Sequence, residues 1–232
     1  MRTVLLNIPE EKQGRRGWRV SVDGKVVPTV GRVTIESEQF GILEYGLDPG
    51  GFDRWSFHET GGWGSVTVPF VLEGAAIYIG VVEQNRVNQG GKVWNVPRGF
   101  VAPGEQHLMT ANRETAEELG GEFRGELKLL PGEPTNPNSA FFESNGTLPS
   151  GEPEGVRFYE LEFKSEDLEQ TDTARRFKPD ALTVNPELTN KRLAEQIMGC
   201  SFIPWQQAIG LSDMFTVAGV GRLVASLGKF GK

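Results

Sequence analysis

The chain has 232 residues, of which 38% are hydrophobic and 24% charged, and its formal net charge is −7. This balance is typical of a soluble globular protein with a sizeable core, and it argues against binding nucleic acid, which needs a basic surface. A single cysteine, Cys200, excludes an intramolecular disulfide. No apolar run reaches the roughly 20 residues that cross a membrane. We therefore expect a cytoplasmic protein that binds neither nucleic acid nor membranes.

Residues 1–60 have the pattern of short strands joined by turns. The segment "WRVSVDGKVV" alternates apolar and polar residues on both sides of Asp23-Gly24, which is a strong hairpin signal. "GRVTIESE" predicts a further strand, and the glycine-rich segments "DPGGFDRW" and "ETGGWG" predict turns. We therefore expect a β-rich N-terminal extension over residues 1–60 and a main domain over residues 61–232.

From Ser65 onward the predicted strands are more apolar. "SVTVPFVLE" and "GAAIYIGVVEQ" fit central strands buried on both faces, and "KVWNVP" is extended because Pro97 excludes a helix there. Residues 106–119 predict a helix that begins after the turn Pro103-Gly104 and ends at Gly120-Gly121.

The second half of the chain alternates between strand and helix patterns. "GELKLLPG" and "GVRFYELEF" predict strands on either side of the turn-rich "PGEPTNPNSAFFESNGTLPSGEPEG". Residues 165–195 are polar and predict a long loop or insertion with some helix. "FIPWQQAIG" and the amphipathic "DMFTVAGVGRLVASL" end the sequence. Together these patterns predict an α+β fold.

The predicted helix at 106–119 crowds three glutamates, Glu114, Glu117 and Glu118, into five residues. Residues three and four apart share a face, so these carboxylates are expected to converge and to repel one another by roughly 0.2–0.5 kcal/mol per pair. An exposed acidic face would tolerate that cost. The neighbouring residues favour a cation site instead: Glu105, about two turns before Arg113, can hold its guanidinium in a bidentate ion pair.

The tight loop before Glu105 can bring a backbone carbonyl, that of Arg98, up to the same carboxylates. Carboxylate and carbonyl oxygens suit Mg²⁺ or Mn²⁺. A zinc site is not expected, because the chain has no cysteine cluster and His107 has no histidine partner at metal-ligand spacing.

Gly99, Glu105 and the run Arg113-Glu114-Thr115-Ala116-Glu117-Glu118-Leu119-Gly120 resemble the Nudix box. That signature is G-x5-E-x7-R-E-U-x-E-E-x-G-U, where U is a bulky aliphatic residue. Every charged position and both glycines match at the right spacing. Gly121 and Thr115 stand where the family usually has aliphatic residues, and both are packing positions.

The resemblance extends beyond the box. Gln84-Asn85-Arg86 and Trp94-Asn95-Val96-Pro97-Arg98-Gly99 resemble the Q-x-R and W-E-L-P-x-G of ADP-ribose pyrophosphatase-like Nudix enzymes, with Asn95 replacing the usual glutamate. Pro134 and Pro137 fall near a proline of that subgroup. The likeness covers about Ser65 to the C-terminus. It implies a Nudix fold, an α/β/α sandwich around a central mixed sheet, and a homodimer built by the N-terminal extension.

The resemblance also implies a reaction. Nudix enzymes hydrolyse a nucleoside diphosphate linked to a group X, and the subgroup points to ADP-ribose, which gives AMP and ribose 5-phosphate. Glu105 is expected to orient Arg113, and Glu117 to coordinate the metal or to hold a metal-bound water. The expected ligands of Mg²⁺ or Mn²⁺ are Glu114, Glu117, Glu118 and the carbonyl of Arg98.

The resemblance to ADP-ribose pyrophosphatase-like enzymes implies that the general base is a glutamate on a loop before the final strand. Glu195 is our candidate, although a surface glutamate on a helix fits the sequence equally well, and Glu187 and Glu169 are alternatives. For substrate binding the candidates are Arg86, Arg98 and Trp94. Arg86 would bind a phosphate or ribose and Trp94 would stack on a base, but a solvated arginine and a core tryptophan fit the sequence as well.

Other functions stay open at this point. The substrate could be another dinucleotide such as NADH or a diadenosine polyphosphate, a nucleotide sugar, or an oxidised nucleoside triphosphate. A non-catalytic nucleotide-sensing module is a further alternative. Such modules usually lack one or more box glutamates, and all four are present here, which favours an enzyme.

Overall fold

The computed structural model describes residues 2–6, 20–22, 25–27, 32–38, 41–47, 53–59, 63–86, 90–135, 155–171 and 175–228. The chain divides into two compact units. The first comprises Met1–Trp63, Ala102–Gly104 and Thr135–Gly155, and the second comprises Gly64–Val101, Glu105–Pro134 and Val156–Lys232. Most of the turn-rich segment predicted between residues 131 and 155, including Pro137, lies outside the described residues.

The first unit contains a four-stranded antiparallel sheet in the order β1-β4-β5-β6. Its strands are β1 (Arg2–Leu6), β4 (Arg32–Ser37), β5 (Gly41–Leu47) and β6 (Asp53–Glu59). The short strands β2 (Val20–Val22) and β3 (Lys25–Val27) pair on either side of Asp23-Gly24, as predicted. The end of "DPGGFDRW" is strand and not turn, because Trp55 and Phe57 alternate with polar residues and favour β structure.

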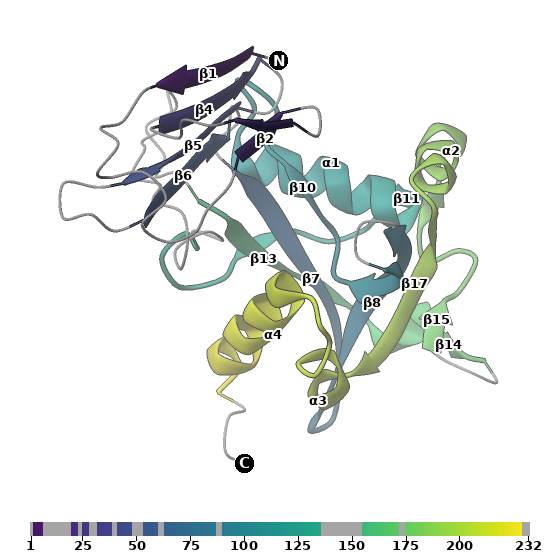
Figure 1. Cartoon of the computed structure of the whole chain (residues 1–232). Coiled ribbons are helices and arrows are strands. Elements are labelled where there is room, and N and C mark those ends of the chain that lie inside the picture. Colours follow the sequence, from purple (N-terminus) through teal and green to yellow (C-terminus); the bar gives the residue numbers. More distant parts are fainter. Residues whose placement is uncertain are drawn as a thin grey trace. The chain divides into compact units, whose positions relative to one another are not determined.

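The second unit is built on a nine-stranded sheet (Figure 1). Seven strands follow the order β12-β13-β7-β8-β17-β15-β14, while β10 pairs with β7 and β9 with β8. The strands are β7 (Gly64–Glu73), β8 (Ala76–Arg86), β9 (Gly91–Asn95), β10 (Arg98–Phe100), β12 (Lys128–Leu129), β13 (Arg157–Phe163), β14 (Leu168–Gln170), β15 (Arg175–Phe177) and β17 (Ile197–Pro204). Among these strands β13 and β7 run parallel and the other pairs antiparallel, so the sheet is mixed.

Helices α1 (His107–Leu119) and α4 (Met214–Ser226) cover opposite faces of this sheet. Successive residues of a strand point to opposite faces. Thr67 of β7 bonds to Thr115 of α1, whereas the next residue, Val68, lies against Gly219 of α4. This arrangement confirms the predicted α+β class with helices on both sides of a mixed sheet.

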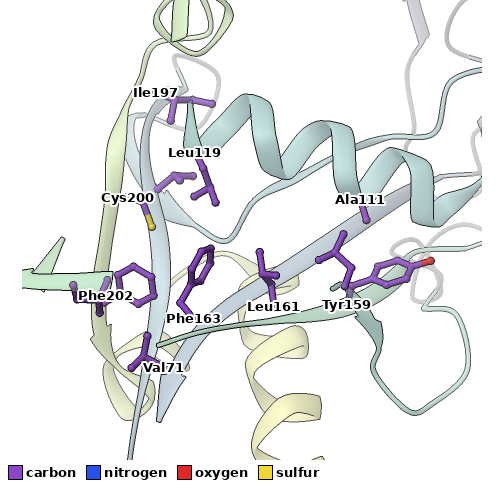
Figure 2. Close-up of a cluster of buried hydrophobic side chains, with 12 residues drawn as sticks. Val71, Ala111, Leu119, Tyr159, Leu161, Phe163, Ile197, Cys200 and Phe202 are labelled. Atoms are coloured by element: carbon purple, nitrogen blue, oxygen red, sulfur yellow. The ribbon is translucent and has the colours of Figure 1, made fainter. Parts of the chain in front are cut away.

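The core beneath α1 is a cluster of buried side chains (Figure 2). Ala111 and Leu119 of α1 lie over Tyr159, Leu161 and Phe163, which alternate along β13 and so share one face. Cys200 belongs to the same cluster, and burial raises the pKa of its thiol. The cysteine is therefore a packing residue, as the sequence predicts.

Residues 165–195 are more regular than the sequence analysis expected. They form a 3₁₀ turn (Ser165–Asp167), the strands β14 and β15, β16 (Thr183–Val184) and α2 (Pro186–Ala194). The overlooked helix signal is Asn185-Pro186: the Asn185 side chain accepts hydrogen bonds from the first turn of α2, and proline occupies its first position. None of the helices in the described ranges is long and apolar enough to cross a membrane.

Candidate active site

Helix α1 begins and ends close to the predicted residues. Gln106 precedes its first residue, and Gly120 follows its last with a φ of 80°, a left-handed conformation that favours glycine. The N–H of Gly120 donates to the carbonyls of Ala116 and Glu117 at 3.0 and 3.1 Å. The second glycine of the box therefore ends the helix directly after the acidic residues.

The predicted pair of Glu105 and Arg113 is present. Arg113 Nε donates to Glu105 Oε1 at 3.0 Å, and Arg113 Nη2 donates to Glu105 Oε2 at 2.8 Å. Thr110 Oγ1 donates to Oε2 as well, at 2.7 Å. The hydrogen bonds that Arg113 donates to Glu105 raise the pKa of Arg113. This bidentate pair fixes Glu105 to the helix.

The carboxylate of Glu114 lies directly on Gly99. A Cβ atom at position 99 would overlap it, so any other residue at the first position of the box would displace the Glu114 side chain. Arg113 Nη1 also contacts Glu114 Oε1. Burial raises the pKa of Glu114, and the charges of Arg113 and Lys191 oppose that rise.

The carbonyl of Arg98 points away from β7. The N–H of Thr67 donates to the carbonyl of Pro97 at 2.8 Å, and the next pair in the ladder is Arg98 with Val66. Pairs in an antiparallel ladder alternate between bonded and non-bonded positions. Arg98 therefore occupies a non-bonded position, and its carbonyl is available to another partner.

Glu118 is the most deeply buried acid of α1, at 3% exposed, and its Oε2 has no hydrogen-bond partner among the described residues. Burial raises its pKa well above the ordinary range; the charges of Glu114 and Glu195 raise it further, whereas those of Arg86 and Arg98 lower it. Three residues predicted from distant parts of the sequence, Arg86, Arg98 and Glu195, thus act on this one carboxylate.

Glu117 turns to a partner that the sequence analysis did not find. Its Oε2 lies 2.5 Å from Lys191 Nζ of α2 and 3.6 Å from Arg113 Nη1. No three His, Cys, Asp or Glu side chains in the described part of the chain are grouped so that they could hold one metal ion. Arg113 contacts Glu114, and Arg113 and Lys191 both contact Glu117. The metal-binding role of the three glutamates stays a prediction.

The donor set still fits a hard divalent cation. Glu114 and Glu118 supply carboxylate oxygens, and the Arg98 carbonyl is turned away from its partner strand β7. The buried Oε2 of Glu118 has no hydrogen bond among the described residues, which is costly unless a cation or a donor faces it.

The side chain of Arg98 is bound to the beginning of α4. Its Nη1 lies 2.5 Å from Asp213 Oδ1, and its guanidinium lies over the ring of Phe215 at 4.8 Å. Asp213 precedes the first residue of α4 and accepts hydrogen bonds from the N–H and hydroxyl of Thr216. Thr216 Oγ1 in turn accepts from the N–H of Val96 at 3.0 Å. Helix α4 therefore holds the segment that presents the Arg98 carbonyl.

Asp213 is not among the site residues predicted from the sequence, although "SDMF" before an apolar helix is a recognisable capping signal. Lys191 is also absent from the predicted residues, for a different reason. Nothing local in the sequence connects a lysine of one helix with a glutamate of another.

Arg86 and the turn that carries Glu195 are held together. Arg86 Nε donates to Gln84 Oε1 at 2.7 Å, and burial lowers the pKa of Arg86. Its neighbour Asn85 bonds to both the backbone and the side chain of Gln196, at 3.2 and 2.7 Å. Glu195 is an exposed residue at the end of α2. Its position before β17 agrees with the predicted place of a base, but its role stays a prediction.

The remaining candidates are placed without further contacts that assign a role. Trp94 lies half-buried on β9 opposite Glu83. Glu187 is in the first turn of α2, and Glu169 lies on β14 at the far edge of the sheet. The substrate-binding role of Trp94 and the two alternative bases therefore stay predictions.

The two departures within the Nudix box itself, Thr115 and Gly121, have a structural explanation. Thr115 is fully buried, and its hydroxyl donates to Thr67 Oγ1 at 2.8 Å, so a hydrogen bond seats the helix on β7. Gly121 lies in β11 (Gly121–Glu122), which pairs with β16, and a Cβ there would come within 2.8 Å of the Thr183 carbonyl. The glycine is required because the backbone of β16 approaches it too closely for a side chain.

The spacing of these residues, the Glu105–Arg113 pair and the acidic face of α1 agree with the pattern of the Nudix box. A family model described as NUDIX domain matches residues 65–198, more than half of the chain. The chain therefore belongs to the Nudix family and is a Nudix hydrolase, a pyrophosphohydrolase that acts on small nucleotide substrates.

No curated protein matches the chain. Among solved structures it is similar to an Ap4A hydrolase of C. elegans (16% identity, TM-score 0.43), with 72% of this chain and 98% of that chain covered. It is also similar to a mutT/nudix family protein of Listeria innocua (17%, 0.41; 72% and 94% covered), and to an ADP compounds hydrolase (12%, 0.45; 86% and 94% covered). These similarities are too distant to bear on the substrate.

Proposed function

We propose that the protein hydrolyses ADP-ribose to AMP and ribose 5-phosphate with Mg²⁺ or Mn²⁺. The observation that carries the proposal is the buried carboxylate of Glu118, whose Oε2 has no hydrogen-bond partner among the described residues. The charges of Glu114, Arg86, Arg98 and Glu195 act on it. Acids and arginines around one buried acid suit a substrate that carries phosphates and needs a divalent cation. The choice of ADP-ribose rests on the resemblance of the segments before the box.

The metal would be held by Glu114, Glu118 and the carbonyl of Arg98, with Glu117 as a further ligand or as the holder of a metal-bound water. When bound, a divalent cation neutralises the pyrophosphate and lowers the pKa of a bound water. Glu105 would orient Arg113, and through it the adjacent Glu114. Asp213 would keep the Arg98 segment in place from the opposite face of the sheet.

Glu195 would accept the proton of the attacking water, since it is exposed to solvent and acts on Glu118. Arg86 and the guanidinium of Arg98 would balance the charge of the substrate phosphates. Trp94, half-buried on β9, would stack on the base.

A panel of nucleoside diphosphate derivatives tests the proposal. With Mg²⁺ or Mn²⁺ the purified protein should release AMP and ribose 5-phosphate from ADP-ribose, and a chelator should stop the reaction. Turnover of NADH, a diadenosine polyphosphate or a nucleotide sugar in place of ADP-ribose would contradict the proposed substrate but support the proposed type of reaction. A lack of turnover of every member with either metal would contradict the proposal.

We also propose that residues 1–60 are a separate extension that builds a homodimer. Support comes from the antiparallel sheet β1-β4-β5-β6, which lies wholly within these residues. Light scattering on the full chain should give the mass of two chains, and a mass of one chain at micromolar concentration would contradict the proposal.

A further inference from the structure

Helix α2 is attached to the C-terminal end of α1 by its side chains. Thr189 Oγ1 donates to the carbonyl of Gly120 at 3.0 Å, and Arg192 Nη1 donates to the carbonyl of Leu119 at 3.4 Å. The last carbonyls of a helix have no partners inside it. These two bonds therefore keep α2 in place next to the acidic residues of α1.

Lys191 lies next to Arg192 on the same helix, but it contacts the acids themselves. Its Nζ is 2.5 Å from Glu117 Oε2, the Glu117 side chain is 7% exposed, and the Lys191 side chain is 46% exposed. The ion pair therefore joins a nearly buried carboxylate, that of Glu117, to a flexible and partly exposed lysine side chain. It holds Glu117 towards α2, and no three acids in the described residues are grouped around one point.

We propose that Lys191 is a positioning residue that competes with the divalent cation for Glu117 and so lowers the affinity of the acidic site for that cation. The proposal rests on the proposed function insofar as Glu114, Glu117 and Glu118 bind the cation. An ammonium group on one acid repels a divalent ion on its neighbours, and a cation that engages Glu117 must first replace the lysine. Because Thr189 and Arg192 hold α2 separately, only the lysine side chain has to move.

Substitutions at Lys191 and Arg192 distinguish the effect of the Lys191 charge from the effect of attaching α2 to α1. Lys191→Met should bind Mn²⁺ about tenfold more tightly than the wild type, the size expected for a unit charge close to a divalent ion in a solvated site. Lys191→Arg keeps the charge and should bind as the wild type does. Arg192→Met is the matched control: it removes the same charge from the same helix and a bond to α1, but it has no contact with Glu117, so its affinity should stay within about twofold.

The measurement is Mn²⁺ binding to the full chain without substrate, by calorimetry or by the loss of the free-ion electron paramagnetic resonance signal. A tighter Lys191→Met with an unchanged Arg192→Met supports the proposal. Equal affinities of Lys191→Met and wild type, or an equal gain in Arg192→Met, overturn it while the metal site stands. If the wild type binds no Mn²⁺, both this proposal and the proposed metal site are wrong, so the two failures are distinguishable.

Discussion

Helices α1 and α4 have the same length, 13 residues, and pack on opposite faces of the same strand, yet they bury different chemistry. The buried set of α1 is largely polar and consists of His107, Thr110, Ala111, Thr115, Glu117, Glu118 and Leu119. The buried set of α4 is mainly apolar or small and consists of Thr216, Gly219, Val220, Leu223 and Val224. One helix carries the acids of the site, and the other supplies apolar packing.

This difference indicates how the fold tolerates the buried carboxylates of α1. Buried carboxylates lower the stability of the metal-free protein, whereas the apolar face of α4 contributes stability in proportion to its buried area. Helix α4 also contributes one contact to the site on α1. Asp213, at the beginning of α4, binds Arg98, the residue whose carbonyl is turned away from β7. Substitutions in α1 should therefore affect activity, and those inside α4 should affect stability.

Glu118→Gln is expected to have the largest effect. Loss of a metal-binding carboxylate should lower kcat/KM by at least about a hundredfold, more than the loss of a group that only supports a ligand. The melting temperature in chelator should not fall, because a buried charge is removed. Steady-state rates with Mg²⁺ measure the effect, and Glu126→Gln, an exposed acid, is the control. An unchanged rate would show that Glu118 is not a ligand.

Leu223→Ala should have the opposite profile. This fully buried side chain of α4 leaves a cavity when truncated, and the free energy of unfolding should fall by about 2–5 kcal/mol. The folded fraction should keep its kcat. Urea unfolding measures the loss, and Met214→Ala, at an exposed position of the same helix, should stay within about 0.5 kcal/mol. A stability change as small as that of the control would mean that α4 is not a main source of packing energy.

Asp213→Asn tests the ion pair between the beginning of α4 and Arg98. Asparagine precedes helices as well as aspartate does, so α4 should remain. The charged partner of Arg98 is lost, however, and kcat/KM should fall about tenfold, as for other groups that support a ligand. Asp213→Ala should lose about 1 kcal/mol of stability in addition, which separates the capping role from the ion pair. Equal activity of wild type and Asp213→Asn would show that Asp213 only caps α4 and does not support the site.

The pH dependence of stability should show the smallest effect. Burial raises the pKa of Glu118 and of Glu114, so the folded protein binds more protons than the unfolded chain above the ordinary glutamate range. Stability in chelator should therefore fall as the pH rises through the folded pKa values. The melting temperature should drop by a few degrees between about pH 5 and pH 8, and less in Glu118→Gln. A rise over that range would contradict the assigned direction.

The sequence by itself determined the parts of the site that depend on spacing along one helix. Glu105 lies two residues before α1, close enough along the chain for Arg113 in the second turn to reach it, and Gly120 ends α1 because glycine accepts a left-handed conformation. The strand pattern likewise predicted β7, β8 and β13. These features are local, so the order of residues is sufficient to define them.

Only the tertiary structure decided which partners the acids have. Lys191 reaches Glu117 from α2, and Asp213 reaches Arg98 from α4, across contacts between elements far apart in the chain. The glycine at position 121 likewise has its reason in β16, a strand within residues that the sequence pattern described as a loop. Ion pairs and close approaches of this kind depend on how helices and strands pack, and no local pattern of residues encodes their geometry.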